Sequence, residues 1–181
     1  MLKVGDKLPA TKLQEFIEVE GNGCSLGPNA FDVAQLTEGK TIAIFGLPGA
    51  YTPTCSAKHV PGYVEQAEAF KAAGVDEIWC VSVNDAFVMN QWAKAQELEN
   101  VKVIPDGSGE FTRRVGMLVR KDNLGFGLRS WRYAAIVKDG VVEAWFEEPG
   151  LADNHGEDPY GVSSPENVLG WLEADARSVA A

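Results

Sequence analysis

Hydrophobic and polar residues follow one another along this chain in two alternating patterns. Short, nearly unbroken apolar runs are typical of strands covered on both faces, and apolar residues at steps of three and four are typical of helices. These patterns predict strands at residues 11–19, 41–45, 76–83, 101–104, 132–137 and 141–146. They predict helices at residues 31–36, 55–73, 85–97, 110–115 and 164–177, the first being a single turn.

The order of these elements indicates the fold class. Strands that alternate with helices pair in parallel, and the Asp139-Gly140 turn between the last two strands predicts an antiparallel hairpin. We therefore expect an α/β fold with a mixed β-sheet and helices on both faces. No repeat, low-complexity segment or linker divides the chain, so a single domain is expected over residues 1–181.

Several local features refine this prediction. The Asn22-Gly23 pair marks a hairpin turn after the first strand. Pro61 is expected to kink or interrupt the helix at 55–73 near its first turns. Residues 116–130 and 147–163 carry no regular pattern and are expected to be irregular. The face that the helix at 85–97 is expected to bury consists of Phe87, Val88, Trp92 and Ala95.

Charge and composition exclude some classes of function. The 181-residue chain has a formal net charge of −10, which argues against a nucleic-acid partner or an anionic membrane. Its first residues lack the apolar core of a signal peptide, and no run approaches a membrane span. The three cysteines include no Cys-x-x-Cys pair and no Cys/His cluster, so no metal site is expected. An odd cysteine count without an export signal suits a reducing compartment, and the expected location is cytoplasmic.

The position of Cys55 in the sequence favours a nucleophilic thiol. The strand at 41–45 leads into a loop rich in glycine and proline, and Cys55 comes at the start of the next predicted helix. The first turn of a helix offers unpaired backbone N–H groups and a partial positive charge, which favour the thiolate over the thiol. Only the thiolate is a strong nucleophile. The alternative is that Cys55 is a small buried apolar residue, the usual fate of a lone cysteine.

The residues around Cys55 resemble a known family. Pro48-x-x-x-Thr52-x-x-Cys55 looks like the active-site motif of the peroxiredoxins. The resemblance implies a thioredoxin-like fold and an antioxidant, thiol-dependent peroxidase that needs no cofactor. Such an enzyme reduces hydrogen peroxide and organic hydroperoxides while its cysteine becomes a sulfenic acid. The longer match to the type II (5-type) subgroup consists of Pro48-Gly49-Ala50-Tyr51-Thr52-Pro53-Thr54-Cys55-Ser56 and His59-Val60-Pro61-Gly62-Tyr63, and the resemblance continues at residues 81–88 and 132–140.

The resemblance also implies roles for individual residues. Arg132 precedes an aromatic residue and an apolar strand that ends in Asp-Gly, like the active-site arginine of the subgroup, and would stabilise the thiolate and the leaving oxygen. The Thr52 hydroxyl can both donate and accept, so it suits the peroxide. Pro48 lacks an N–H and has a rigid ring, so it can exclude water. The loop with Thr54 and Gly49 would bind the peroxide through backbone N–H groups as charge develops on the leaving oxygen.

Other residues have simpler interpretations. Arg129 is expected to be a solvated loop charge. His59, one turn after Cys55, could touch the site or lie on the helix surface. Cys80 lies in an apolar strand and is expected to be a buried small hydrophobe, while Cys24 is not assigned. The tryptophans are expected to provide core and interface area, and they are Trp79, Trp92, Trp131, Trp145 and Trp171.

The chain departs from the subgroup in its recycling step. Some members carry a resolving cysteine in the last third of the chain, and here no cysteine follows Cys80. A one-cysteine cycle is therefore expected, with glutathione and glutaredoxin as the favoured reductant and thioredoxin as the alternative. The resemblance further implies a homodimer.

Rival functions stay open at this point. A thioredoxin-type thiol–disulfide oxidoreductase would need a Cys-x-x-Cys motif, but Thr52 stands where its first cysteine would be. A non-catalytic redox sensor or a chaperone-like holdase could be oxidised at Cys55 and would turn over slowly with any reductant.

Overall fold

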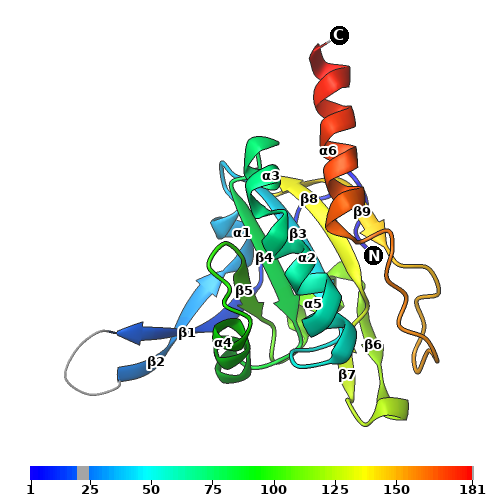
Figure 1. Cartoon of the computed structure of the whole chain (residues 1–181). Helices are drawn as coiled ribbons and strands as arrows, with labels where there is room; N and C mark the ends of the chain where they lie inside the picture. Colours follow the sequence, from blue (N-terminus) through cyan, green and yellow to red (C-terminus); the bar gives the residue numbers. More distant parts are fainter. Residues whose placement is uncertain (20–24, 181) are drawn as a thin grey trace.

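A computed structural model gives the fold of the chain (Figure 1). It describes residues 1–19 and 25–180, except for the side chains of residues 17–28, so Cys24 and the turn expected at residues 20–23 lie outside the described residues. The strands are β1 (Lys12–Val19), β2 (Ser25–Asp32), β3 (Thr41–Leu47), β4 (Glu77–Ser82), β5 (Lys102–Pro105), β6 (Leu118–Arg120), β7 (Leu128–Ser130), β8 (Tyr133–Lys138) and β9 (Val141–Glu147). The helices are α1 (Val33–Leu36), the π-helix η1 (Cys55–His59), α2 (Val60–Glu65), α3 (Ala67–Ala72), α4 (Ala86–Ala95), α5 (Glu110–Val115), the 3₁₀-helix η2 (Asp122–Leu124) and α6 (Pro165–Ala180).

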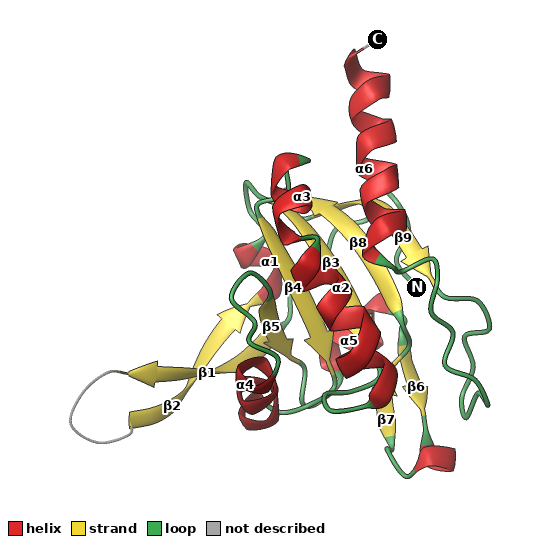
Figure 2. Cartoon of the chain, in the orientation of Figure 1, coloured by secondary structure: helices red, strands yellow, loops and turns green. Residues whose placement is uncertain are grey.

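Five strands form the central sheet in the order β5–β4–β3–β8–β9 (Figure 2). β3, β4 and β5 are parallel, β8 runs antiparallel to β3, and β9 runs antiparallel to β8. The Asp139-Gly140 turn joins β8 to β9, as predicted. The predicted mixed sheet and the α/β class are therefore confirmed.

Alternate side chains of the central sheet enter two separate apolar layers. On β3, Phe45 and Leu47 face one layer, and Ile42 and Ile44 face the other, because successive residues of a strand point to opposite sides. Residues of α2, α3, α4 and α6 complete the first layer. Residues of α1, α5 and β1 complete the second. Helices cover both faces of the sheet, as the element order predicted.

One end of the sheet brings together segments that lie far apart in the sequence. The parallel strand β3 ends there, whereas the antiparallel strand β8 begins there, and Gly46 pairs with Tyr133. β9 ends at the same place, since Glu147 also pairs with Tyr133. The loop after β3, the residue before β8 and the loop after β9 therefore meet at this end, which is the lower end in Figure 1.

Two predicted segments differ in the structure. Phe31 and Asp32 were expected in a helical turn but belong to β2, which pairs antiparallel with β1. The helix α1 starts only at Val33, because the Asp32 carboxylate accepts hydrogen bonds from the first backbone N–H groups. Residues 116–130, expected to be irregular, contain the small antiparallel sheet β6–β7 with η2 between its strands. Strands of three residues are too short to show an alternating pattern.

The predicted helix at 55–73 is divided into three parts. Its helical backbone begins at Pro53, widens into the π-helix η1, and continues as α2 and α3, which are separated at Gln66. The N–H of Val60 bonds to the carbonyl of Cys55, five residues earlier. Pro61 follows directly and cannot donate the next bond, in agreement with the predicted interruption near the first turns. Single-turn π-helices are frequent at functional sites.

The buried face of α4 also differs from the prediction. Trp92 is buried and Val88 is half-buried, as predicted. However, Phe87 is 61% exposed, Ala95 is exposed, and Met89 is buried in their place. The helix lies near β1 and β5 at the edge of the central sheet, so a narrower stripe of side chains is covered than the pattern indicated.

Candidate active site

Cys55 is fully buried at the end of the sheet where the loop after β3, the start of β8 and the loop after β9 meet. It lies in the first turn of the helical segment that begins at Pro53, so the sulfur is at a helix N-terminus, as predicted. Tyr51, four residues earlier, has a φ of 63°, a conformation that costs a non-glycine residue on the order of 1–3 kcal/mol. Such strain is found where surrounding structure holds a loop in place, which is common at active sites.

Arg132 places a permanent cation beside this sulfur. It directly precedes β8, its guanidinium is 1% exposed, and Nη2 donates to Sγ of Cys55 over 3.4 Å. Burial disfavours the charge of Arg132, but the Cys55 thiolate and the Asp158 carboxylate outweigh it and raise the pKa of the guanidinium. The structure thus brings Arg132 to the position that the resemblance implied.

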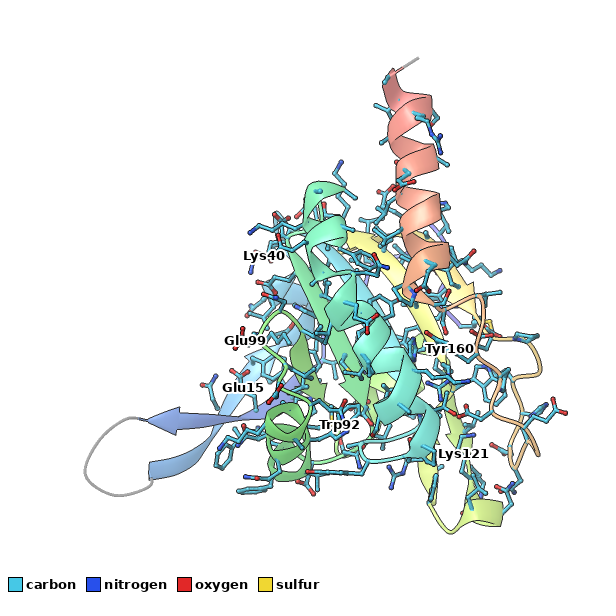
Figure 3. The ribbon with its side chains drawn as sticks, viewed as in Figure 1. Glu15, Lys40, Trp92, Glu99, Lys121 and Tyr160 are labelled. Carbon is cyan, nitrogen blue, oxygen red and sulfur yellow. The ribbon has the colours of Figure 1, made fainter. Side chains whose placement is uncertain are left out.

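Asp158 holds the other side of the guanidinium. Its Oδ1 and Oδ2 accept from Arg132 Nη2 over 2.9 and 2.8 Å, and Oδ1 accepts from Nε over 3.3 Å. The ring of Tyr160, labelled in Figure 3, lies 5.9 Å from the guanidinium carbon. Sequence reasoning missed Asp158 because it lies in the loop after β9, where a carboxylate without a regular pattern around it is usually solvated.

His59 is buried behind Cys55 and contacts the same guanidinium, which decides between the two alternatives left open. Its Nδ1 lies 2.9 Å from Arg132 Nη1, and its Nε2 lies 3.2 Å from the carbonyl of Ser163. A guanidinium can only donate, so Nδ1 accepts and Nε2 carries the proton. Burial and the charge of Arg132 keep the pKa of His59 well below 6.5, so the ring is neutral.

Glu148 fixes the turn that positions His59. Its Oε1 accepts from the backbone N–H groups of Gly161 and Ser163 over 2.7 and 2.9 Å, and from the Ser163 hydroxyl over 2.8 Å. The carbonyl of Ser163 accepts from the Tyr63 hydroxyl over 2.9 Å as well as from His59. A continuous chain of buried hydrogen bonds therefore leads from Glu148 through Ser163 and His59 to the guanidinium beside Cys55.

The loop between β3 and η1 is held from the opposite side by Arg129. Nη1 of Arg129 donates to the carbonyl of Pro48 over 3.4 Å, and a Cβ on Gly49 would lie 2.5 Å from the same nitrogen. The expectation that Arg129 is a solvated loop charge is therefore wrong. Burial lowers the pKa of Arg129, opposed by the Cys55 thiolate. Thr52 donates to the carbonyl of Gly49 over 2.7 Å, so its hydroxyl oxygen keeps its lone pairs for a ligand.

A cavity of about 400 Å³ opens beside this loop. Pro48, Thr52 and Thr54 line it on the side of the cysteine, and Gly49 does not reach it. The opposite side is formed by the hairpin β6–β7 and the loop after β9, through Lys121, Leu124, Phe126 and residues 155–158. The cavity is far larger than a hydrogen peroxide molecule.

Cys80 lies on β4 and is fully buried, as predicted. Burial raises the pKa of its thiol well above the ordinary value, and the nearby Cys55 adds to this effect. Among the described residues, Cys55 and Cys80 are both free thiols.

Comparison with known proteins identifies the family of this chain. The family model described as Redoxin matches residues 3–158. A peroxiredoxin of Rhizobium etli is 59% identical over 155 residues, which cover 83% of this chain and 87% of that protein. The chain belongs to the peroxiredoxin family. Peroxiredoxins are thiol-dependent peroxidases, so the predicted class of enzyme is confirmed.

Solved peroxiredoxin structures have the same fold. Reduced Prx3 from Vibrio vulnificus in complex with hydrogen peroxide superposes with a TM-score of 0.84 at 37% identity, over 97% of this chain and 99% of that one. The Plasmodium falciparum antioxidant protein, a 1-Cys peroxiredoxin, superposes with a TM-score of 0.87 at 33% identity, over 96% and 99%. The thioredoxin-like fold is thereby confirmed. In the described part of this peroxiredoxin, no helix has the length and apolar character needed to cross a membrane.

Proposed function

We propose that this peroxiredoxin reduces hydrogen peroxide and organic hydroperoxides with the Cys55 thiolate as nucleophile. The observation that carries the proposal is the 3.4 Å contact between Arg132 Nη2 and Cys55 Sγ inside a buried site. The thiolate attacks the terminal peroxide oxygen, an S–O bond forms and the O–O bond breaks. The bonding electrons stay on the leaving oxygen, which takes up a proton and departs as water or an alcohol. Cys55 is left as a sulfenic acid.

Arg132 acts on both charges of this reaction. It balances the thiolate before attack and the leaving oxygen in the transition state, where a preorganised donor has the largest effect. Thr52 already donates to Gly49, so its hydroxyl oxygen is free to accept the hydrogen of the peroxide O–H. Pro48 and Thr54 line the cavity on the cysteine side and limit the access of water. Gly49 contributes through its missing Cβ, which leaves room for Arg129.

The sulfenic acid is proposed to be reduced by an external thiol, with glutathione and glutaredoxin favoured over thioredoxin. Support comes from Cys80, whose burial and raised pKa make it a poor attacking thiol. Its strand position is a second obstacle, since reaching Cys55 from β4 would require local unfolding. A cytoplasmic location, where such thiols are kept reduced, fits this cycle.

We also propose that the enzyme is a homodimer. Large apolar side chains are exposed on the β3–η1 loop, on α4 and on the β6–β7 hairpin, elements that lie at the lower end of the molecule in Figure 1. Contact with a second copy would remove this apolar surface from water. These exposed side chains are Tyr51, Phe87, Leu124 and Leu128.

The test is steady-state peroxide reduction with the glutathione/glutaredoxin and thioredoxin systems side by side. Cys55→Ser is expected to lose peroxide consumption while keeping its fold, and retention of more than a trace of the wild-type rate would remove the central proposal. Cys80→Ser and Cys24→Ser are expected to keep turnover with glutathione and glutaredoxin.

A separate measurement tests the one-cysteine cycle. The protein is oxidised with one equivalent of hydrogen peroxide without reductant, and its disulfides are mapped by mass spectrometry. A high yield of an internal disulfide to Cys55, together with lost turnover in the matching serine variant, would replace the one-cysteine cycle by a two-cysteine one.

A further inference from the structure

Lys121 is a buried cation beside the candidate active site. Lys121 is 3% exposed, and within the described ranges its ammonium forms no hydrogen bond or ion pair. The ammonium lies 5.4 Å from the ring of Trp131, a cation–π contact. Burial lowers the pKa of Lys121, and the positive charge of Arg132 lowers it further. The negative charges of Asp158 and Cys55 act in the opposite direction. Lys121 therefore contributes a positive charge to the electrostatic surroundings of Cys55, and no carboxylate of the described residues is its dedicated counter-ion.

Lys121 lines the 400 Å³ cavity opposite the cysteine loop. Lys121 directly follows β6 and is labelled at the lower right in Figure 3. Pro48, Thr52 and Thr54 line the other side of the cavity. Cavities of roughly 300–1,000 Å³ bind molecules of many heavy atoms. A peroxide with two oxygen atoms would leave most of this volume unused.

The charges around the cavity define what it can bind. Asp158 lines the cavity, but its carboxylate is engaged by Arg132 through both oxygens. Glu157 lies at the exposed rim and forms no ion pair within the part of the chain that the structure describes. Within the described residues, one cation, Lys121, and one anion, Glu157, are thus uncommitted, and the apolar side chains of Leu124 and Phe126 line the same cavity.

We propose that this cavity binds the low-molecular-weight thiol that reduces the Cys55 sulfenic acid, with Lys121 pairing with a carboxylate of that thiol. The inference rests on the proposed one-cysteine cycle and names the site of its second step. Glutathione has the matching chemistry, because it carries two carboxylates for Lys121 to select from, one ammonium for Glu157, and a thiol between them. Its size also suits the volume of the cavity.

The bonds of this step balance without a further reactant. The thiol sulfur attacks the sulfur of the Cys55 sulfenic acid, an S–S bond forms, and the S–O bond breaks. The hydroxyl leaves with the proton of the thiol as water. Cys55 is reduced and the incoming thiol is oxidised, and the mixed disulfide is the product that a second thiol then releases.

The experiment measures the rate of mixed-disulfide formation in a single turnover. The full-length protein is oxidised with one equivalent of hydrogen peroxide, mixed with a thiol, quenched, and analysed by intact mass. The thiols are glutathione, its monoethyl ester, and cysteamine, which has no carboxylate, and each rate is divided by the concentration of thiolate. In the wild type we expect the rate to fall from glutathione to cysteamine, with the ester between them.

The variants Lys121→Met, Lys121→Arg and Lys138→Met carry the test. Lys121→Met keeps the apolar stem over Trp131 and is expected to lower the ratio of the glutathione rate to the cysteamine rate on the order of ten-fold. Lys121→Arg, which keeps the charge, is expected to restore most of the ratio. Lys138→Met removes an exposed lysine near the β8–β9 turn and is the matched control with the wild-type ratio.

Three outcomes would overturn the inference. An unchanged ratio in Lys121→Met would show that Lys121 pairs with no carboxylate of the thiol. Equal wild-type rates for glutathione and cysteamine would show that no carboxylate of the thiol is recognised at this site. If Cys55 still consumed peroxide in that case, the proposed peroxidase function would be unaffected. A third arm compares a carboxylate-bearing hydroperoxide with its methyl ester. If Lys121→Met changed that ratio and not the thiol ratio, the carboxylate would belong to the peroxide.

Discussion

Nη2 of Arg132 lies 3.4 Å from Sγ of Cys55, although 77 positions separate the two residues in the sequence. The same nitrogen donates to both carboxylate oxygens of Asp158, so one buried cation is shared between a thiolate and a carboxylate. When the thiolate becomes a neutral sulfenic acid, Asp158 still balances the buried charge, which would otherwise be costly to keep away from water. Asp158 can therefore keep Arg132 in place through the whole cycle.

Replacing Arg132 tests its role in the transition state. Arg132→Ala is expected to lower the second-order rate with hydrogen peroxide about a hundred-fold, the effect typical of one lost transition-state donor. Arg132→Lys should recover only part of it, because an ammonium lacks the planar fork that reaches Cys55, His59 and Asp158 together. Stopped-flow fluorescence gives the rates, and Arg120→Ala, at an exposed arginine paired with Asp122, is the control. A wild-type rate in Arg132→Ala would refute the assignment.

Replacing Asp158 tests whether it positions Arg132. Asp158→Ala is expected to reduce the rate with hydrogen peroxide about ten-fold, since misplacing a reacting group by a small distance has a large kinetic effect. Asp158→Asn keeps an oxygen acceptor and should lose less. Asp153→Ala removes another carboxylate of the same loop, one that accepts a hydrogen bond from the backbone N–H of Arg120. This control variant should react like the wild type. Equal rates in Asp158→Ala and Asp153→Ala would exclude a positioning role.

His59 predicts a loss of stability in acid. The fold keeps the pKa of His59 well below 6.5 through burial and the charge of Arg132. Below pH 6.5 the imidazole of His59 binds a proton in the unfolded chain but not in the folded chain. The free energy of unfolding therefore falls as the pH decreases from 6.5 toward the pKa of His59 in the folded state. One such proton contributes a slope of about 1.4 kcal/mol per pH unit.

Urea unfolding between pH 7.5 and 5.5 measures this slope. His59→Asn, whose side-chain oxygen can still accept from Arg132, is expected to show a shallower dependence than the wild type. His155→Asn, at the other histidine of the chain, is the matched comparison for the loss of an imidazole. The hypothesis fails if the two variants have the same slope.

Replacing each of two buried tyrosines by phenylalanine is expected to change the free energy of unfolding differently. The Tyr63 hydroxyl donates to the carbonyl of Ser163, so Tyr63→Phe is expected to cost about 1 kcal/mol of unfolding free energy. The Tyr133 hydroxyl is buried and has no hydrogen-bond partner in the described part of the chain, so Tyr133→Phe should be neutral or stabilising. Urea unfolding of both variants at pH 7.5 decides. A clear loss in Tyr133→Phe would indicate an internal water bound to its hydroxyl.

The exposed apolar side chains on α4 and the β6–β7 hairpin predict the oligomeric state. Phe87→Glu and Leu124→Glu are each expected to convert a dimer to a monomer, because a carboxylate in an apolar interface must lose its hydration. Val179→Glu, on the 80% exposed valine near the end of α6, should leave the dimer intact. Sedimentation or light scattering of the three variants gives the molar mass. A wild-type protein that is monomeric at micromolar concentration would rule out the proposed dimer.

The sequence by itself determined the elements whose signals are local. The five strands of the central sheet lie within two residues of their predicted bounds, because an apolar run and the Gly/Pro or Asp-Gly turns beside it are properties of neighbouring residues. The same holds for α5, predicted at 110–115, and for Cys55 at the start of a helical segment.

Tertiary structure decided everything that depends on which segments meet. The pairing of Gly46 with Tyr133 and of Tyr133 with Glu147 brings residues 55, 132 and 158 to one end of the sheet, and no local pattern contains that register. His59 is buried, and Arg129 is packed on the cysteine loop, for the same reason. Whether a charged or polar side chain faces water or a partner is set by packing between distant segments, because the partner supplies the free energy that offsets the loss of hydration.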